Sequence, residues 1–251
     1  NGILWIGTED GGLNALNTAN YELSVYKNIP TDPNSLSVNH ILALFIGKNN
    51  MLWVGTSLGG VDKWNRASEK FRIYRNNPYN PKSISANQIR VIYEDSQSNI
   101  WIGTVEGGLN KWLRDENMFV SYKHETDNPN SLSNNHVRAI VEDKNGIFWL
   151  GTHGGGLNRF DSRTGKFTHY RYNENNPESI NDDEIWSILI DHKGRFWIGT
   201  ENGGVNLFDR QSETFTAFLS NPYDKRTISD NKVTVITEDS KQRIWFGTYD
   251  G

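Results

Sequence analysis

The sequence has 251 residues, a formal net charge of −4 and no cysteine. This slight acidic excess argues against a nucleic-acid-binding surface, which usually carries a surplus of Lys and Arg. Without cysteine, the chain has no disulfide, no thiolate metal site and no cysteine nucleophile. No apolar run approaches the roughly 20 residues of a membrane-spanning helix, and no signal peptide is evident.

One short motif returns along the whole chain at a constant interval. It is written LWIGTEDGGLN at residues 4–14 and returns as LWVGTSLGGVD, IWIGTVEGGLN, FWLGTHGGGLN, FWIGTENGGVN and a shorter IWFGTYDG. Its tryptophans are 48 residues apart, at Trp5, Trp53, Trp101, Trp149, Trp197 and Trp245. A period of roughly 40–50 residues with one tryptophan per unit is typical of β-propeller blades.

Each repeat contains four short strand patterns in a fixed order. The first is apolar and β-branched, as in 89–93, and a turn with Asp, Asn or Gly follows, as in 143–146. The second strand is the W-x-G-T segment, and a Gly-Gly turn leads to the third, as in 157–160. A turn at 161–165 precedes the fourth strand, as in 166–170, and a polar loop with Pro, Asn and Ser then leads to the next repeat. Helical periodicity is not sustained anywhere, so a helical solenoid is not expected.

The constant positions of the repeat have a structural interpretation. The tryptophan should lie between neighbouring sheets, where a large ring buries much apolar area. The glycine two positions later suits close packing of sheets, and the paired glycines suit a turn that needs positive φ. The aspartate of the first hairpin should cap its turn by accepting bonds from backbone amides. It recurs at Asp95, Asp143, Asp191 and Asp239, whereas Gly47 takes its place in the first full repeat.

The sequence therefore predicts an all-β fold, a β-propeller of four-stranded antiparallel blades. We expect a partial blade at 1–34, full blades at 35–82, 83–130, 131–178 and 179–226, and a partial blade at 227–251. The favoured interpretation is a segment of a larger ring of about seven blades. In the alternative, the strand at Val233–Glu238 completes the first blade and closes a five-bladed ring, as ring closure usually pairs strands from both termini.

The repeat unit resembles the two-component regulator propeller repeat, for example in GGLNRFDSRTGKFTHYRYNENNPESINDDEIWSILIDHKGRFWIGT from Gly155 to Thr200. The resemblance covers the whole chain and includes the W-I-G-T, G-G-L-N-R-F, T-G-K-F and N-P-x-S-L/I-S elements. It implies a periplasmic sensor segment of a bacterial hybrid histidine kinase, the extracytoplasmic part of an inner-membrane protein. The kinase activity would lie in another domain, and many such sensors respond to polysaccharide breakdown products.

The repeats differ most where the between-blade loop and the turn after W-x-G-T should emerge on one face. Variation confined to one region of a constant frame is typical of a binding site. An arginine pair can clamp a carboxylate or sulfate, a tryptophan can stack on a sugar ring, and His, Gln and Glu can bond to hydroxyls. We therefore expect an oligosaccharide ligand. The arginine pair favours an acidic oligosaccharide. The candidate ligand-binding residues are His40, Gln88, Arg90, His136, Arg138, His153, Glu184, Trp186, Glu201 and Lys232.

Competing interpretations remain open at these positions. Polar variation on exposed turns is also the ordinary drift of surface residues, and Trp186 could simply plug a central channel. No motif couples Glu184, Glu201 and His153 into catalytic machinery, so we expect no enzymatic activity, no cofactor and no metal. The alternatives are a secreted propeller polysaccharide lyase or hydrolase, or a protein-binding scaffold. Expected partners are the oligosaccharide, neighbouring domains of the same receptor and, as a further option, a second copy of the chain.

Overall fold

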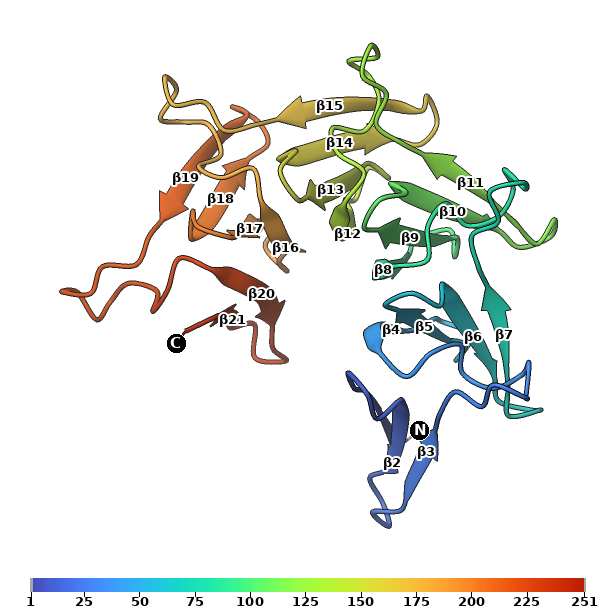
Figure 1. Cartoon of the computed structure of the whole chain (residues 1–251). Coiled ribbons are helices and arrows are strands. Elements are labelled where there is room, and N and C mark those ends of the chain that lie inside the picture. Colours follow the sequence, from blue (N-terminus) through green and yellow to red (C-terminus); the bar gives the residue numbers. More distant parts are fainter. Residues whose placement is uncertain (1, 251) are drawn as a thin grey trace. The chain divides into compact units, whose positions relative to one another are not determined.

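The computed structural model describes residues 2–250, which are built from β-strands, turns and loops without any helix (Figure 1). The chain forms two compact units, Asn1–Tyr122 and Lys123–Gly251. Every strand pairing within the sheets is antiparallel, and each sheet joins strands that follow one another along the chain. The predicted all-β fold with four-stranded antiparallel blades is confirmed.

The first unit contains three sheets. A three-stranded sheet is followed by two four-stranded sheets, each in chain order. The strands are β1 (Ile3–Gly7), β2 (Leu13–Asn17), β3 (Leu23–Tyr26), β4 (Ile41–Ile46), β5 (Leu52–Thr56), β6 (Val61–Asn65), β7 (Lys70–Tyr74), β8 (Ile89–Glu94), β9 (Ile100–Thr104), β10 (Leu109–Leu113) and β11 (Met118–Tyr122).

The second unit repeats this plan with two four-stranded sheets and one two-stranded sheet. The strands are β12 (Val137–Glu142), β13 (Phe148–Thr152), β14 (Leu157–Asp161), β15 (Lys166–Tyr170), β16 (Ile185–Ile190), β17 (Phe196–Thr200), β18 (Val205–Asp209), β19 (Thr214–Phe218), β20 (Val233–Glu238) and β21 (Ile244–Thr248). Strand β20 pairs with β21, and the first sheet has the order β1-β2-β3. Strand β20 and the first sheet belong to different units, so ring closure stays a prediction.

The tryptophan and glycine columns hold neighbouring sheets together, as the repeat predicts. Trp149 of β13 is buried, and its ring centroid lies 5.1 Å from that of Phe196 and 5.4 Å from that of Phe208 in the next sheet. A Cβ on Gly55 would lie 2.7 Å from Cγ2 of Ile89, closer than real Cβ contacts allow. Any larger residue would push the two sheets apart, so glycine is required there.

The hairpin aspartates cap their turns and also hold the tryptophans. Asp95 Oδ1 accepts the backbone N–H groups of Gln97 and Asn99 at 2.9 and 2.7 Å, as predicted. Its Oδ2 accepts the indole N–H of Trp101 at 2.9 Å, a bond that the sequence reasoning missed. The same indole–aspartate bond recurs at Trp149, Trp197 and Trp245. The constant spacing of six residues between the aspartate and the tryptophan is the signal that could have revealed it.

Burial of the repeated positions varies between the sheets. Trp245 is 53% exposed, whereas Trp53 and Trp101 are fully buried. In the first sheet Leu4 and Ile6 are exposed, although the equivalent Leu52 and Val54 of the second sheet are buried. The same side chain is therefore part of the core only where another sheet lies against it.

Candidate functional site

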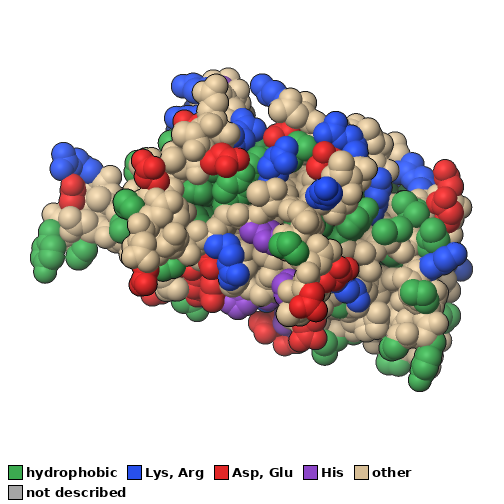
Figure 2. Space-filling model, turned by 90° about the horizontal axis from the view of Figure 1, so that it is seen from above, with side chains coloured by type: hydrophobic (Ala, Val, Ile, Leu, Met, Phe, Trp, Pro, Cys, Tyr) green, Lys and Arg blue, Asp and Glu red, His purple; other side chains and the backbone are tan. Residues whose placement is uncertain are grey.

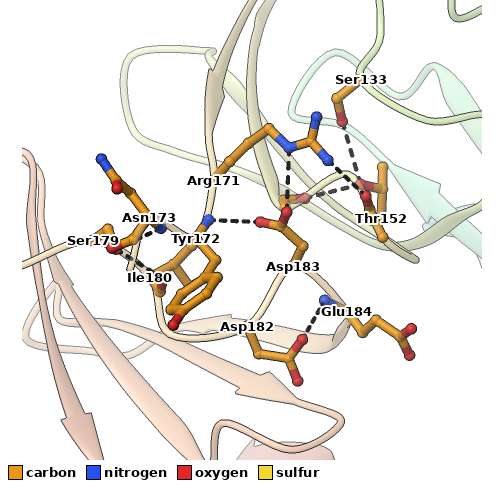
Figure 3. A network of polar contacts seen from close by, with 12 residues as sticks. Ser133, Thr152, Arg171, Tyr172, Asn173, Ser179, Ile180, Asp182, Asp183 and Glu184 are labelled. Atoms are coloured by element: carbon orange, nitrogen blue, oxygen red, sulfur yellow. Dashed lines mark hydrogen bonds and ion pairs between the residues drawn. The ribbon is translucent and has the colours of Figure 1, made fainter. Parts of the chain in front are cut away.

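The between-blade loops are held in place by a repeated set of hydrogen bonds. In the loop before β16, Asp183 Oδ1 accepts the backbone N–H of Tyr172 at 2.7 Å, and Ser179 Oγ accepts that of Asn173 at 3.0 Å (Figure 3). Arg171 donates to Asp183 Oδ2 at 3.3 Å and to the carbonyl oxygen of Gly154 at 3.0 Å. These bonds explain the constant Ser or Thr of the loop and give the variable positions a rigid support.

In the other repeats an asparagine takes the place of Asp183 in holding the loop. An Asn side-chain oxygen accepts the N–H of the residue 11 positions earlier, at 2.7 or 2.8 Å, at Asn39, Asn87, Asn135 and Asn231. The residue after each asparagine, and after Asp183, is a repeat position whose chemistry varies, at 40, 88, 136, 184 and 232. The loop chemistry is therefore constant up to the position at which the chemistry of the repeats diverges.

Two repeat positions of variable chemistry, at 40, 88, 136, 184 and 232 and at 57, 105, 153, 201 and 249, are joined by backbone hydrogen bonds in the five sheets from β4 onward. The carbonyl oxygen of the residue before the first strand of the sheet accepts the N–H of the residue after W-x-G-T. The bonds are Ser57 to His40, Val105 to Gln88, His153 to His136, Glu201 to Glu184 and Tyr249 to Lys232, at 2.9–3.1 Å. The expected proximity of these two columns within a blade is therefore a geometric property of the fold.

A third repeat position of variable chemistry, at 42, 90, 138, 186 and 234, lies on a β-bulge. In β12 the register shifts between Val137 and Ala139, so Arg138 is the extra residue of the bulge. The same shift occurs around Leu42, Arg90, Trp186 and Thr234. A bulge re-aims a side chain out of the regular strand alternation and is common beside binding sites. Each of the five sheets from β4 onward thus presents one side chain of variable chemistry from its first strand.

A charged and aromatic cluster forms in the second unit, and we call Arg138, Trp186, Glu201 and Lys232 the Trp186 cluster. The guanidinium carbon of Arg138 lies 3.9 Å from the ring centroid of Trp186, and its Nη1 lies 4.0 Å from Glu201 Oε2. The indole N–H of Trp186 donates to Glu201 Oε2, and Lys232 Nζ lies 2.8 Å from Glu201 Oε1. Four of the ten predicted ligand-binding residues are therefore in mutual contact.

The charges of the Trp186 cluster shift the pKa values of its members. Burial raises the pKa of Glu201, but bonds from Lys232 and Trp186 and the charges of Lys232 and Arg138 outweigh it, so the pKa lies below its usual value. The hydrogen bond to Glu201 raises the pKa of Lys232 above its usual value. Both groups are therefore ionised near neutral pH, and the cluster carries two positive charges and one negative charge.

Three further predicted residues form a second group in the same unit. His153 Nδ1 lies 3.0 Å from Glu184 Oε2, and the two residues also form an isolated β-bridge. The ring centroids of His136 and His153 are 5.0 Å apart in an edge-to-face arrangement. Figure 3 shows the Glu184 side chain directed away from Asp183, while its backbone N–H is held by Asp182. The remaining three predicted residues, His40, Gln88 and Arg90, belong to the first unit.

Arg138 is more constrained than the sequence reasoning assumed. Its side chain is 10% exposed, stacks on one face of Trp186 and approaches Glu201. The expected clamp of Arg90 and Arg138 on an acidic group stays a prediction, since the two residues belong to different units. Truncation of Arg138 should lower the free energy of unfolding, because its contacts hold the Trp186 ring.

The structure adds Tyr249, which the sequence reasoning left out of the site. Tyr249 is 68% exposed, and Lys232 Nζ lies 4.2 Å from the centroid of its ring. An open depression beside this pair is lined by Glu201, Asn202, Ser220, Pro222, Asp230, Asn231, Lys232, Tyr249 and Asp250. Tyr249 stands in the same repeat column as Glu201 and His153, so its position in that variable column was the available signal.

The described surface carries charged side chains of both signs. In Figure 2, basic and acidic side chains are interspersed on the face shown. Within residues 2–250, no group of three or more His, Asp or Glu side chains is arranged to hold a metal ion. No helix of this described part is long and apolar enough to span a membrane.

The comparisons identify the repeat. The model of the two-component regulator propeller family matches residues 83–106, 131–154, 179–202 and 227–250. The chain therefore carries two-component regulator propeller repeats, and the resemblance seen in its sequence is confirmed. No curated protein matches the sequence.

Solved structures with the same fold include extracellular domains of putative two-component systems and a lyase. The extracellular domain of the putative hybrid two-component system BT3049 from B. thetaiotaomicron has 29% identity and a TM-score of 0.79, over 98% of this chain and 31% of that one. For the equivalent domain of BT4673 the values are 20%, 0.75, 98% and 30%. Virginiamycin B lyase from Staphylococcus aureus has 16% identity and a TM-score of 0.68, over 97% of this chain and 73% of that one, and shows the fold alone. The chain spans about a third of the length of the two extracellular domains.

Proposed function

We propose that this chain is a ligand-sensing segment of a bacterial two-component receptor, located outside the cytoplasm, in the periplasm. The matching family model and the similarity to extracellular domains of putative hybrid two-component systems support this function. Kinase activity would reside in a separate domain of the receptor. The segment itself is non-catalytic in this proposal.

The ligand site is proposed to be the Trp186 cluster together with Tyr249, and the ligand an oligosaccharide. The observation that carries this proposal is the combination of a half-buried and an exposed aromatic ring with Glu201 and Lys232 between them. Aromatic faces bind the apolar face of a sugar ring, and a carboxylate and an ammonium group bond to hydroxyls. The rigid loop supports hold these side chains ready for a ligand.

The charges locate an acidic group of such a ligand. Arg138 and Lys232 bring two positive charges against the single carboxylate of Glu201, which leaves one positive charge in the cluster. Asp230 and Asp250 line the outer depression and repel an anion there. An acidic sugar would therefore place its carboxylate toward Arg138 and its hydroxyls toward the depression.

Signalling would follow from a change in how this segment is arranged relative to its neighbours, rather than from a change within a blade. The sheets are held by buried aromatic contacts and by hydrogen-bonded loops, so a bound ligand has little freedom to deform them. A ligand shifts an equilibrium only by binding two arrangements with different affinity. The proposed arrangements are those of this segment relative to neighbouring domains of the receptor or to a second copy.

Substitution of Lys232 by alanine is expected to weaken oligosaccharide binding at least about ten-fold, because a charged hydrogen-bond donor is lost. Trp186→Ala should weaken binding similarly. Binding would be measured by calorimetry with matched neutral and uronic-acid-containing oligosaccharides. Lys241→Ala, at an exposed lysine of the β20–β21 turn, is the control and should bind like the unaltered protein.

The same samples separate the alternatives. Unchanged affinity in both Lys232→Ala and Trp186→Ala would contradict the proposed site. Release of shortened or unsaturated sugar products during incubation would instead favour the polysaccharide lyase or hydrolase interpretation. Saturable binding without turnover supports the receptor.

A further inference from the structure

A groove in the first unit is lined by aromatic rings. It has a volume of about 450 Å³ and lies between the sheets β1–β3 and β4–β7. Trp5 and Trp64 meet edge to face with ring centroids 5.0 Å apart, and the Tyr26 ring lies 5.9 Å from Trp5 and 6.0 Å from Trp64. Three aromatic side chains from two sheets therefore surround one open space.

The next groove along the chain has the same aromatic arrangement but is filled. Trp53, Tyr74 and Trp112 occupy the equivalent repeat positions, and the centroids of the two indole rings are 4.9 Å apart, again edge to face. The ammonium group of Lys63 lies 5.5 Å from the centroid of Trp53 and 4.6 Å from that of Trp112. Gly47, Asn49 and Met51 of the β4–β5 turn also line this second groove, which has a volume of about 150 Å³.

Ala15 places no ammonium group over the aromatic rings of the first groove. It occupies the repeat position of Lys63, 48 residues earlier, and is buried in the groove wall. The same position carries Lys111, whose ammonium group lies 5.2 Å from the centroid of Trp101. In the first unit, two repeats therefore place a lysine ammonium group over an indole ring, and the repeat with Ala15 does not. Attraction between a cation and the face of an indole ring is the physical basis of this contact.

The charges around the two grooves also differ in sign. The first groove is lined by Glu22, Glu69 and Arg66, a net charge of −1. The second is lined by Lys63, Arg114 and Glu94, a net charge of +1.

Individual positions show how this difference arises. Ser24 stands where the second repeat has Arg72, and Arg72 is one of the charges that lower the pKa of Lys63, after burial. Glu69 stands where the next repeat has Asn117, and its charge adds to burial in raising the pKa of Tyr26. A cation in the first groove thus gains acidic neighbours and loses a repelling one.

We propose that the groove of Trp5, Tyr26 and Trp64 binds the alkylammonium group of a small amine or of a lysine side chain. The ammonium would occupy the place that Lys63 fills in the next repeat, over the faces of Trp5 and Trp64. Its alkyl chain would contact the apolar wall at Ala15, and Glu22 and Glu69 would balance its charge. This site is independent of the proposed oligosaccharide site, which lies in the second unit.

The test uses n-butylammonium as the probe and 1-butanol as its neutral counterpart. Binding is followed by the indole N–H resonances of the tryptophans in NMR spectra of the whole chain. We expect saturable shifts of the Trp5 and Trp64 signals, with an affinity for n-butylammonium at least ten-fold above that for 1-butanol. The Trp53 signal, whose groove holds Lys63, should stay in place. Equal affinity for the two probes, or no saturable shift, would overturn the proposal.

Ala15→Lys is the decisive variant, since it supplies the missing ammonium from the chain itself. It should abolish the response to n-butylammonium and raise the melting temperature above that of Ala15→Met, which fills similar space without charge. Glu22→Gln combined with Glu69→Gln should lower the affinity at least three-fold while leaving the aromatic rings intact. Retained binding in a folded Ala15→Lys protein would show that the probe sits elsewhere and would refute the site.

A second pair of probes distinguishes the two sources of the amine. Nα-acetyl-lysine amide presents a lysine side chain, and Nα-acetyl-norleucine amide presents the same chain without the charge. Binding of the lysine derivative at least as tightly as n-butylammonium assigns the groove to a lysine side chain of a partner. Binding of n-butylammonium alone assigns it to small free amines.

Discussion

Replacing Asp62 by asparagine is expected to stabilise the protein, with a gain that grows from near zero at pH 4 to about 4 kcal/mol above pH 8. Asp62 is fully buried on β6, at a repeat position where Asn110, Asn158 and Asn206 stand in the other sheets. It is the one carboxylate in a column that elsewhere carries neutral amides. Its ionised form therefore lies in a site whose hydrogen-bond partners suit an amide.

The hydrogen bonds around the column show the mismatch. Asn110 accepts the backbone N–H of Ser85 at 3.0 Å and donates its amide N–H to Ser85 Oγ at 2.7 Å. Asp62 Oδ2 likewise accepts the backbone N–H of Ser37 at 2.7 Å. Asp62 Oδ1 and Ser37 Oγ, however, are both buried without a hydrogen-bond partner. An asparagine or a protonated aspartate can donate to Ser37 Oγ as Asn110 does to Ser85 Oγ, whereas an ionised aspartate can only accept from the hydroxyl.

This environment sets the direction of the pH dependence. Burial raises the pKa of Asp62 from 3.8 to about 7, against the lowering effects of the Ser37 backbone hydrogen bond and the Arg75 charge. Below about pH 4 the carboxyl is protonated in both the folded and the unfolded chain. Between pH 4 and 7 only the unfolded chain loses the proton, so the free energy of unfolding falls as the pH rises. Each pKa unit corresponds to about 1.4 kcal/mol, which gives the total of about 4 kcal/mol.

Urea denaturation at pH values from 4 to 9 measures this prediction. The difference between the Asp62→Asn protein and the unaltered protein should rise with pH and level off above about pH 8. Asn110→Asp is the matched control in the same unit, and it should lose stability at pH 8 but little at pH 4. A difference that does not change with pH would show that Asp62 is not the group responsible.

The sequence predicted the frame of this protein well, because the frame is repeated. Glycine at 55 and its equivalents, the hairpin aspartates and the buried tryptophans each have a short-range reason that a 48-residue period makes visible. The bulge residues were recognised as variable, but not as bulges, since the extra residue appears only in the pairing register. Ring size and blade boundaries stay predictions.

The candidate site was less predictable, because long side chains choose their partners only in the folded structure. The repeat columns identified Arg138, Trp186, Glu201 and Lys232 as positions of interest. Their mutual contacts depend on side chains from three different sheets, and spacing along the chain does not encode those contacts. The groove at Ala15 was not predicted, because a small residue at a repeat position that elsewhere carries a long one looks like a neutral substitution in the sequence.

Trp149→Ala is expected to lower the free energy of unfolding by about 3–5 kcal/mol, as is typical for truncation of a buried large side chain. Trp149 is 3% exposed, contacts Phe196 and Phe208 of the next sheet and lies 6.0 Å from the Tyr170 ring. Removing the indole opens a cavity between two sheets. It also takes a hydrogen-bond donor from Asp143 Oδ2, which keeps only Arg210 at 3.5 Å.

Two substitutions separate the contributions to this loss. Trp149→Phe keeps an aromatic ring but removes the indole N–H, so it should cost about 1–2 kcal/mol for the hydrogen bond and the smaller ring. Trp245→Ala is the matched control in the same unit, since Trp245 also donates to its hairpin aspartate at 2.9 Å but is 53% exposed. It should cost about 1 kcal/mol, mostly from the lost bond to Asp239. Unfolding would be followed by circular dichroism, because the substitutions themselves change the tryptophan fluorescence. Equal losses at Trp149 and Trp245 would mean that packing between sheets contributes little and that the tryptophan column acts through the hairpin bond alone.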